Sequence, residues 1–212
     1  MKEWNKLNLG WKNAFINAWD AFKEKTIPIG CVIQNEMDET VAIGRNMIYQ
    51  TNNSDMILYN NKLAHAEINA ILLLKESLHP KLKKYTLYTT MEPCILCFGA
   101  MVMGNIRNVK YAARDRFAGA TAINKIHEYT VSKKINVEGP IEELEYFQIC
   151  IQSYYELENH PNNCERILVE FEKDCMNGVI TAKKLFENKI LNKYCEENKN
   201  IEYIYNKLME NY

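Results

Sequence analysis

Two short segments contain the side chains best suited to metal chemistry. Residues 65–67 read His-Ala-Glu and supply an imidazole and a carboxylate, and residues 93–97 read Pro-Cys-Ile-Leu-Cys and supply two thiols. Cys94 and Cys97 are three positions apart, so they lie on the same face of a helix. With His65 they provide three ligands and leave the fourth tetrahedral position free for water, as in catalytic zinc sites. The sequence therefore predicts a catalytic Zn²⁺ centre held by His65, Cys94 and Cys97.

Glu67 follows His65 by two residues, which places its carboxylate near the metal but aims it differently. Zinc lowers the pKa of a bound water from 15.7 to about 7, so hydroxide is available at neutral pH. A carboxylate beside that water can accept and return protons. We therefore expect Glu67 to be the general acid/base of a hydrolytic reaction.

Each of these motifs has an ordinary explanation when it stands alone. A His-x-Glu triplet is common by chance, and a Cys-x-x-Cys pair is often half of a structural zinc site or a redox pair. A structural site would need a fourth ligand. The thiol on a neighbouring predicted strand, Cys31, has apolar neighbours in the sequence, which is typical of a core residue and not of a zinc ligand. A non-catalytic zinc-containing scaffold is the alternative of a different class, but such a protein has no use for Glu67.

The elements that would position these motifs alternate between helix and strand. The hydrophobic patterns and turn residues predict helices at residues 11–25, 65–75, 94–103, 120–126 and 140–155, and strands at 31–33, 41–43, 85–90, 109–113 and 135–137. This order predicts an α/β sandwich around one mixed sheet. The polar stretch over residues 47–64 is a loop long enough to have a functional role.

The chain after residue 160 has a different character. Three helical stretches are expected there, separated by residues 177–178 and 196–200, and their 8 Lys and Arg are interspersed with 9 Asp and Glu. Mixed charge of this kind indicates a solvated helical surface and not a nucleic-acid-binding tail. We therefore divide the chain into a catalytic domain, residues 1–158, and a C-terminal helical extension, residues 159–212.

Composition narrows the class of protein further. The 212 residues include 26 Lys and Arg against 27 Asp and Glu, so the basic surplus usual for a polyanion-binding protein is missing. Seven cysteines, an odd number, in a chain without a recognisable secretory signal favour reduced thiols and a cytoplasmic protein. The longest apolar run is too short to span a bilayer, so no membrane association is expected.

Over residues 10–155 the sequence resembles the cytidine and deoxycytidylate deaminase superfamily, in which His-x-Glu and Pro-Cys-x-x-Cys form the zinc signature. It is most similar to the branch of the tRNA adenosine deaminases and the related guanine and cytosine deaminases. The resemblance rests on residues 27–33, 44–46, 64–70, 87–101, 111–115 and 119–120. It implies a three-layer α/β/α fold with a mixed sheet, here followed by a C-terminal helical appendage, and hydrolytic release of ammonia from an exocyclic amine.

The same resemblance implies roles for individual residues. It assigns zinc binding to His65, Cys94 and Cys97, proton transfer to Glu67, and substrate binding to Asn46, the backbone of Ala66, Ile27, Glu92 and Asp115. Two of these residues have plain structural alternatives: Asn46 as a turn residue and Asp115 as a solvated loop acid.

The substrate expected first is a free nucleobase or nucleoside, and the alternative is adenosine in a tRNA loop. Two features stand against tRNA: Asn46 and His65 are separated by nineteen positions, more than expected in the tRNA enzymes, and the helices after residue 160 have no counterpart there. These insertions flank the pocket mouth, where they could roof it for small molecules or form a dimer or partner surface. Residues 113–115 and 119–120, in contrast, favour the tRNA branch. A homodimer is expected from the family.

Overall fold

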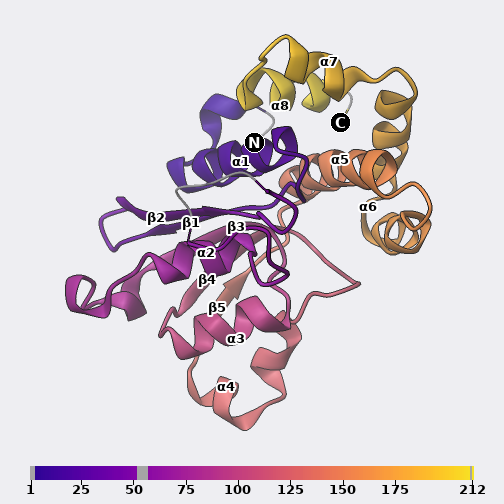
Figure 1. Ribbon diagram of the computed structural model, residues 1–212. Helices are drawn as coiled ribbons and strands as arrows, with labels where there is room; N and C mark the ends of the chain where they lie inside the picture. The colour runs from indigo at the N-terminus through magenta and orange to yellow at the C-terminus, as the bar shows by residue number, and fades with distance from the viewer. Residues whose placement is uncertain (1–2, 52–56, 211) are drawn as a thin grey trace.

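A mixed five-stranded sheet organises the computed structural model, which describes residues 3–51, 57–210 and 212 (Figure 1). The spatial order is β2-β1-β3-β4-β5; β1 is antiparallel to β2 and β3, whereas β3, β4 and β5 are parallel. The strands are β1 (Gly30–Gln34), β2 (Thr40–Arg45), β3 (Thr86–Met91), β4 (Asn108–Ala113) and β5 (Asn136–Glu138).

Eight α-helices and four short 3-10 helices accompany the sheet in the described residues. The α-helices are α1 (Leu9–Lys23), α2 (Ala66–Leu72), α3 (Ile95–Met103), α4 (Glu128–Ser132), α5 (Glu142–Asn159), α6 (Glu165–Glu187), α7 (Ile190–Glu196) and α8 (Ile201–Met209). The 3-10 helices are η1 (Trp4–Lys6), η2 (Glu76–Leu78), η3 (Leu82–Lys84) and η4 (Thr121–Lys125). Within the described part of the chain, none of these helices is long and apolar enough to cross a membrane.

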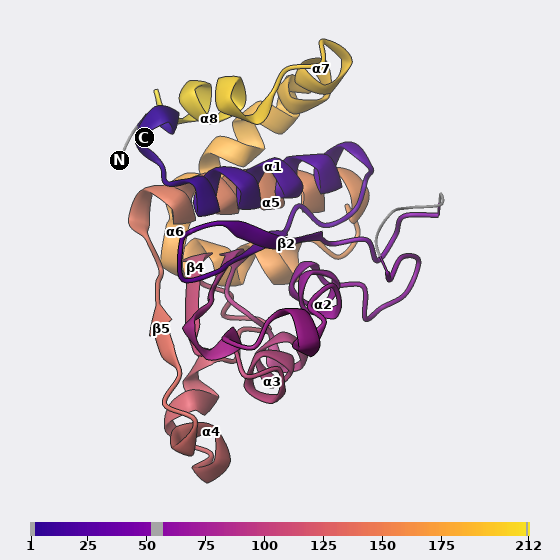
Figure 2. The same cartoon turned by 90° about the vertical axis from the view of Figure 1, so that its left-hand side faces the viewer.

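The strands separate two hydrophobic layers because successive side chains point to opposite faces of a sheet. Val32 and Tyr88 belong to a core shared with α1 and α5, while their neighbours Ile33 and Leu87 belong to a core shared with α2 and α3. Figures 1 and 2 show α1 and α5 on one face of the sheet and α2 and α3 on the other. The predicted three-layer α/β/α fold with a mixed sheet is confirmed.

Helix α6 is interrupted close to the predicted break at residues 177–178, but at Cys175. The backbone of Cys175 is non-helical, with φ of −142° and ψ of 65°, so two helical segments meet there, and the second continues to Glu187. Gly178 lies where α6 contacts α5: a Cβ there would be 3.1 Å from Ile149 Cγ2 and 3.2 Å from the Tyr146 carbonyl oxygen. The glycine therefore lies just after the break and permits close packing of the second segment against α5.

The C-terminal helices pack on the outer side of α1 and α5. Leu191, Ile204 and Tyr205 share a hydrophobic cluster with Phe15 and Phe147. Figure 2 shows α7 and α8 above α1, with α6 leading back to them from the α5 layer. The helical appendage thus extends the core of the sheet domain, and the domain boundary at residue 158 stays a prediction.

The loop over residues 47–64 is partly described. Its segment 52–56, with the sequence Asn-Asn-Ser-Asp-Met, lies outside the described residues. The rest is anchored by backbone pairing of Met47 N with the Ala64 carbonyl at 2.9 Å. The Asn69 side chain also exchanges two hydrogen bonds of 3.0 Å with the backbone of Leu58. These contacts place the described parts of the loop beside the N-terminus of α2.

Candidate active site

The three candidate metal ligands lie at the N-termini of two helices on the same face of the sheet. His65 is the N-cap of α2, Cys94 is the N-cap of α3, and Cys97 lies in the first turn of α3. Gly44 of β2 lets α2 approach the sheet, since a Cβ at this position would be 2.1 Å from the Ala66 carbonyl oxygen. The positive ends of both helix dipoles favour thiolate at this place.

The geometry of this cluster fits zinc. His65 Nδ1 lies 3.6 Å from Cys94 Sγ and 3.5 Å from Cys97 Sγ, and the three donor atoms lie within 4.8 Å of one another. Zn–N and Zn–S bonds of about 2.1 and 2.3 Å at a tetrahedral angle require an N···S separation of about 3.6 Å. No further Cys, His, Asp or Glu joins this cluster in the described part of the chain. Cys31, the candidate fourth thiol, is fully buried in the core on this face of the sheet.

The charges of the cluster are arranged to retain a thiolate. The Cys97 side chain hydrogen-bonds to the Cys94 sulfur and, with the His65 ring, lowers the pKa of Cys94 to about 4. The pKa of Cys97 is raised by the same pairing and by burial. The pKa of His65 is raised, chiefly by its hydrogen bond with Cys94, and the main chain at Lys62 adds a further hydrogen bond to the ring. A bound divalent cation would deprotonate both thiols.

Glu67 lies beside the ligand cluster and is almost completely buried, with 4% of its surface exposed. Its Oε2 accepts a hydrogen bond from Cys97 Sγ at 3.2 Å, and its Oε1 accepts one from Thr89 Oγ1 at 3.1 Å. Burial raises the pKa of this carboxyl above its usual value. A carboxyl group held in this way is suited to accept and release a proton next to a metal-bound water.

A cavity of about 220 Å³ opens onto this cluster. Ten of the residues that line the cavity are either apolar or polar and uncharged. The remaining ones are acidic residues or candidate metal ligands. Most residues predicted from the sequence line it, namely Ile27, Asn46, His65, Glu67, Glu92, Cys94 and Asp115. Cys97 and Ala66 are fully buried next to these residues but do not line the cavity.

Asn46 is held in a fixed orientation. Its Oδ1 accepts hydrogen bonds from Thr26 Oγ1 at 2.9 Å and from the Ile48 backbone N–H at 3.1 Å. The Nδ2 group of this 2% exposed side chain therefore keeps two donors for a molecule in the cavity.

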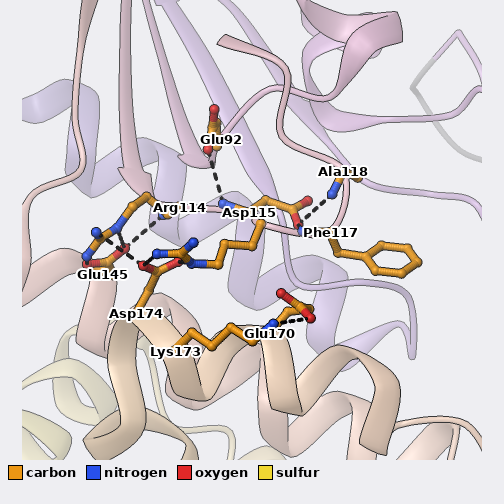
Figure 3. Close-up of polar contacts among 10 residues, drawn as sticks. Glu92, Arg114, Asp115, Phe117, Ala118, Glu145, Glu170, Lys173 and Asp174 are labelled. Carbon is orange, nitrogen blue, oxygen red and sulfur yellow. Dashed lines mark hydrogen bonds and ion pairs between the residues drawn. The ribbon is translucent and has the colours of Figure 1, made fainter. Parts of the chain in front are cut away.

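Glu92 and Asp115 support the segment that follows β4 (Figure 3). Glu92 Oε2 accepts from the Asp115 backbone N–H at 3.2 Å, while Oε1 accepts from the backbone N–H and the hydroxyl of Thr121. Asp115 Oδ1 accepts from the backbone N–H groups of Phe117 and Ala118, and burial raises the pKa of Asp115. Both carboxyl groups thus shape the cavity wall as well as lining it.

The sequence-based reasoning missed a second wall of the cavity. Helix α5 contributes Gln152 and Glu156, and α6 contributes Ile167 and Phe171. The two α6 residues have the i, i+4 spacing of ordinary core positions, so nothing in the sequence distinguishes them. Glu156, in contrast, is an acidic residue in a helix that is largely buried. An acid in such a helix is a sequence signal that could have identified Glu156 as a candidate site residue.

An ion-pair cluster joins α6 to the segment after β4 (Figure 3). Arg114 forms a bidentate pair with Glu145 of α5, at 2.9 and 2.8 Å, and lies 3.2 Å from Asp174 of α6. Arg116 pairs with Asp174 through two bonds of 2.6 and 2.7 Å. Arg166 of α6 also lies 4.7 Å from the centre of the Phe117 ring. The wall supplied by α6 is therefore fastened to the segment that contains Asp115.

Comparison with known proteins agrees with this site. The family described as the cytidine and deoxycytidylate deaminase zinc-binding region matches residues 6–113. A tRNA-specific adenosine deaminase of Aquifex aeolicus is 28% identical over 172 residues, which is 80% of this chain and 95% of that protein. The tRNA-specific adenosine deaminase 2 of Xenopus tropicalis is 32% identical over 52% of this chain and 64% of that protein.

Solved structures also resemble this chain. A structure from a study of A-to-I editing by tRNA:A34 deaminases at the wobble position of transfer RNA is 27% identical, with a TM-score of 0.51. It covers 61% of this chain and 95% of its own. The guanine deaminase of Bacillus subtilis is 28% identical over 56% of this chain and 76% of its own, with a TM-score of 0.43.

Proposed function

Because the chain belongs to the cytidine and deoxycytidylate deaminase zinc-binding family, a family of zinc-dependent hydrolases acting on C–N bonds, we propose that it deaminates a free nucleobase or nucleoside. The finding that carries the choice of substrate is the composition and small volume of the cavity. No Lys or Arg lines it among the described residues, and its charged walls are the acids Glu67, Glu92, Asp115 and Glu156. Acidic walls oppose a phosphate group, whereas they accept N–H groups of an uncharged base.

The size of the cavity supports the same substrate class. Pockets for drug-sized ligands measure about 300–1,000 Å³, and this cavity of about 220 Å³ is smaller. Ile167 and Phe171 of α6 close one side of it, and the pairing of Asp174 with Arg114 and Arg116 holds α6 in place. A small planar molecule fits such an enclosure better than a nucleotide within a folded RNA.

Each residue of the site has a role in this proposal. His65, Cys94 and Cys97 hold zinc, which when bound supplies the Lewis acidity that activates water at neutral pH. Glu67 would accept a proton from the attacking water and pass it to the ring nitrogen, and would then take the second proton, from the newly formed C–OH group, and pass it to the departing amine. Asn46 donates hydrogen bonds to the base through its Nδ2 group.

A direct test is ammonia release by the zinc-loaded protein. The substrates are cytosine, cytidine, guanine, adenine, adenosine and a tRNA anticodon stem-loop. We expect turnover of at least one free base or nucleoside and no inosine in the stem-loop. Inosine formation without turnover of any small substrate would contradict the proposal.

A second candidate, adenosine deamination in tRNA, is favoured by the match to 95% of the Aquifex aeolicus tRNA-specific adenosine deaminase. The same panel distinguishes the two candidates, because it contains both free bases and nucleosides and a stem-loop in which the adenosine is part of a polyanionic RNA. A homodimer and a cytoplasmic location stay predictions from the sequence.

A further inference from the structure

Glu156 is a buried acid in the cavity wall without a partner. It is 3% exposed, and it makes neither a side-chain hydrogen bond nor an ion pair with any of the residues that the structure describes. Buried polar groups nearly always have a hydrogen-bond partner, and an unpaired buried carboxyl group is destabilising. An acid retained in such a place is therefore a candidate for binding a ligand.

Gln152 lies one helical turn before Glu156 and lines the same cavity. Its Oε1 accepts a hydrogen bond from Gln148 Nε2 at 3.1 Å, and Gln148 Nε2 also donates to the Pro28 carbonyl at 2.9 Å. This arrangement fixes the amide of Gln152 and leaves its Nε2 group with two donors. Gln152 and Glu156 thus present a donor and an acceptor side by side.

This pair and the metal cluster line the same cavity from elements on opposite faces of the sheet. Helix α5 packs on one face of the sheet, whereas α2 and α3, which begin at His65 and Cys94, pack on the other. We infer that a base whose amine-bearing carbon lies at His65 and Cys94 presents its far edge to α5. The complement of an acceptor beside a donor is a ring N–H beside a carbonyl.

We propose that Glu156 and Gln152 form a subsite for the ring N–H and adjacent carbonyl of a free nucleobase, which makes the protein select free bases over nucleosides. Free cytosine has this edge: its N1–H adjoins the C2 carbonyl, and N1 lies across the ring from C4, which bears the amine. In cytidine N1 is bonded to ribose, so Glu156 would meet no donor. The subsite rests on the proposed function, since it assumes a base in this cavity.

The test compares cytosine with 1-methylcytosine, which keeps the C4 amine but lacks the N1–H. In the zinc-loaded protein we expect kcat/KM to be at least about 100-fold higher for cytosine, because sites that hydrogen-bond a substrate N–H reject analogues without it. Glu156→Gln should lower kcat/KM for cytosine about 10- to 100-fold, mainly through KM, and Glu156→Leu should lower it further. Both variants should lower the value for 1-methylcytosine much less than that for cytosine, so the preference for cytosine shrinks.

Glu165→Gln is the matched control, since Glu165 is an exposed acid on α6 that does not line the cavity. It should leave both substrates unaffected. An equal loss on cytosine and 1-methylcytosine in the Glu156 variants, or an unchanged preference for cytosine, would overturn the subsite.

A binding measurement separates this inference from the proposed function. Calorimetric titration with uracil and 1-methyluracil needs no turnover, and uracil keeps the N1–H beside the C2 carbonyl. Preferential binding of uracil that Glu156→Gln abolishes would support the subsite even in a protein that deaminates no free base. Turnover of free bases together with equal binding of the two ligands would leave the proposed function standing and overturn the subsite.

Discussion

The candidate zinc ligands are held in place by contacts that exist before any metal binds. Cys94 has a pKa of about 4 because Cys97 and His65 hydrogen-bond to its sulfur, so this thiol is already ionised at neutral pH. The main chain at Lys62 binds the His65 ring, which orients Nδ1 toward the sulfurs. Outer contacts of this kind fix the tautomer of a ligating histidine. The site is therefore prearranged for the metal.

Removal of both thiols should remove the metal. We expect the wild-type protein to contain about one zinc per chain, and the double variant Cys94→Ala, Cys97→Ala to contain almost none and to melt at a lower temperature. Elemental analysis after dialysis measures the first effect and circular dichroism the second. Full zinc retention in the double variant would show that other residues bind the metal.

Substitution of Glu67 should separate metal binding from catalysis. Glu67→Gln preserves the shape of the side chain and its contact with Thr89, so zinc content should equal that of wild type. The rate should nevertheless fall at least about 100-fold, the low end for a positioned acid/base. Steady-state kinetics with the best small substrate provides the measurement. A variant that turns over near the wild-type rate would assign proton transfer to another group.

Glu156 should make stability depend on pH. Burial raises its pKa from 4.5 to about 7, so between these pH values the folded protein binds more protons than the unfolded chain. The free energy of unfolding therefore falls as pH rises through this window, by up to about 3 kcal/mol, and the penalty is complete above pH 7. Glu156→Gln removes it: the variant should be more stable than wild type at pH 8 and equal at pH 4.

Urea unfolding at both pH values measures this effect. Glu67, Glu92 and Asp115 also face the cavity, but they are present in both proteins, so their contributions cancel in the difference. Glu165→Gln, at an exposed position in the first turn of α6, should change the stability by less than about 1 kcal/mol at either pH. Equal stability of wild type and Glu156→Gln at pH 8 would mean that Glu156 has a partner in solution.

At the scale of elements, the sequence predicted the features that local residue patterns determine, namely the strands and the starts of the helices. Hydrophobic patterns and turn residues identified all five strands, and helix-start signals placed His65 and Cys94 at helix N-termini, where the structure has them. Residues 177–178 predicted a break two residues after the actual one at Cys175, whereas the contact of Gly178 with α5 could not be predicted, because it depends on which helix packs there. The helix α2 also ends at Leu72, three residues before its predicted end, since the apolar pattern continues beyond the helix.

The ion pairs between α6 and the segment after β4 should keep the cavity closed. Asp174 is 5% exposed and pairs with Arg114 and Arg116, so Asp174→Asn leaves two guanidinium groups without their shared carboxylate. Because both arginines are partly solvated, we expect a loss of about 1–3 kcal/mol in unfolding free energy, below the cost of breaking a fully buried pair. KM for the small substrate should rise while kcat changes less.

Glu170→Gln is the matched control for this experiment. Glu170 pairs with Lys173 on the surface of the same helix, within one turn, and Figure 3 shows this pair apart from the Asp174 cluster. An exposed pair of this kind contributes less than about 1 kcal/mol, so stability and KM should be nearly unchanged. Equal effects of the two substitutions would mean that Asp174 does not hold α6 against the cavity.

At the scale of the whole molecule, the last quarter of the chain is where sequence and structure differ most. Amphipathic spacing predicted helices after residue 160 but contained no information about which surface they cover. The sequence left open a roof over the pocket or a partner surface, and the structure places Ile167 and Phe171 of α6 in the cavity wall. The surface that such a helix covers depends on the whole fold and not on its local sequence. The burial of Glu156 in the cavity wall also depends on the whole fold, so it could not be predicted from the residues around it.

Response to salt follows from this arrangement and tests the class of substrate. A protein that makes six to ten phosphate contacts loses about 10³–10⁵-fold in affinity between 50 and 200 mM salt. The net charge here is −1, and no Lys or Arg lines the cavity within the described residues, so an uncharged base displaces few counterions. We expect KM for the best free base to change less than about 2-fold over this range. Initial rates at constant pH in NaCl measure it, with heat-treated protein as the blank. A steep rise of KM with salt, accompanied by inosine in the stem-loop, would identify a polyanionic substrate and favour the tRNA alternative.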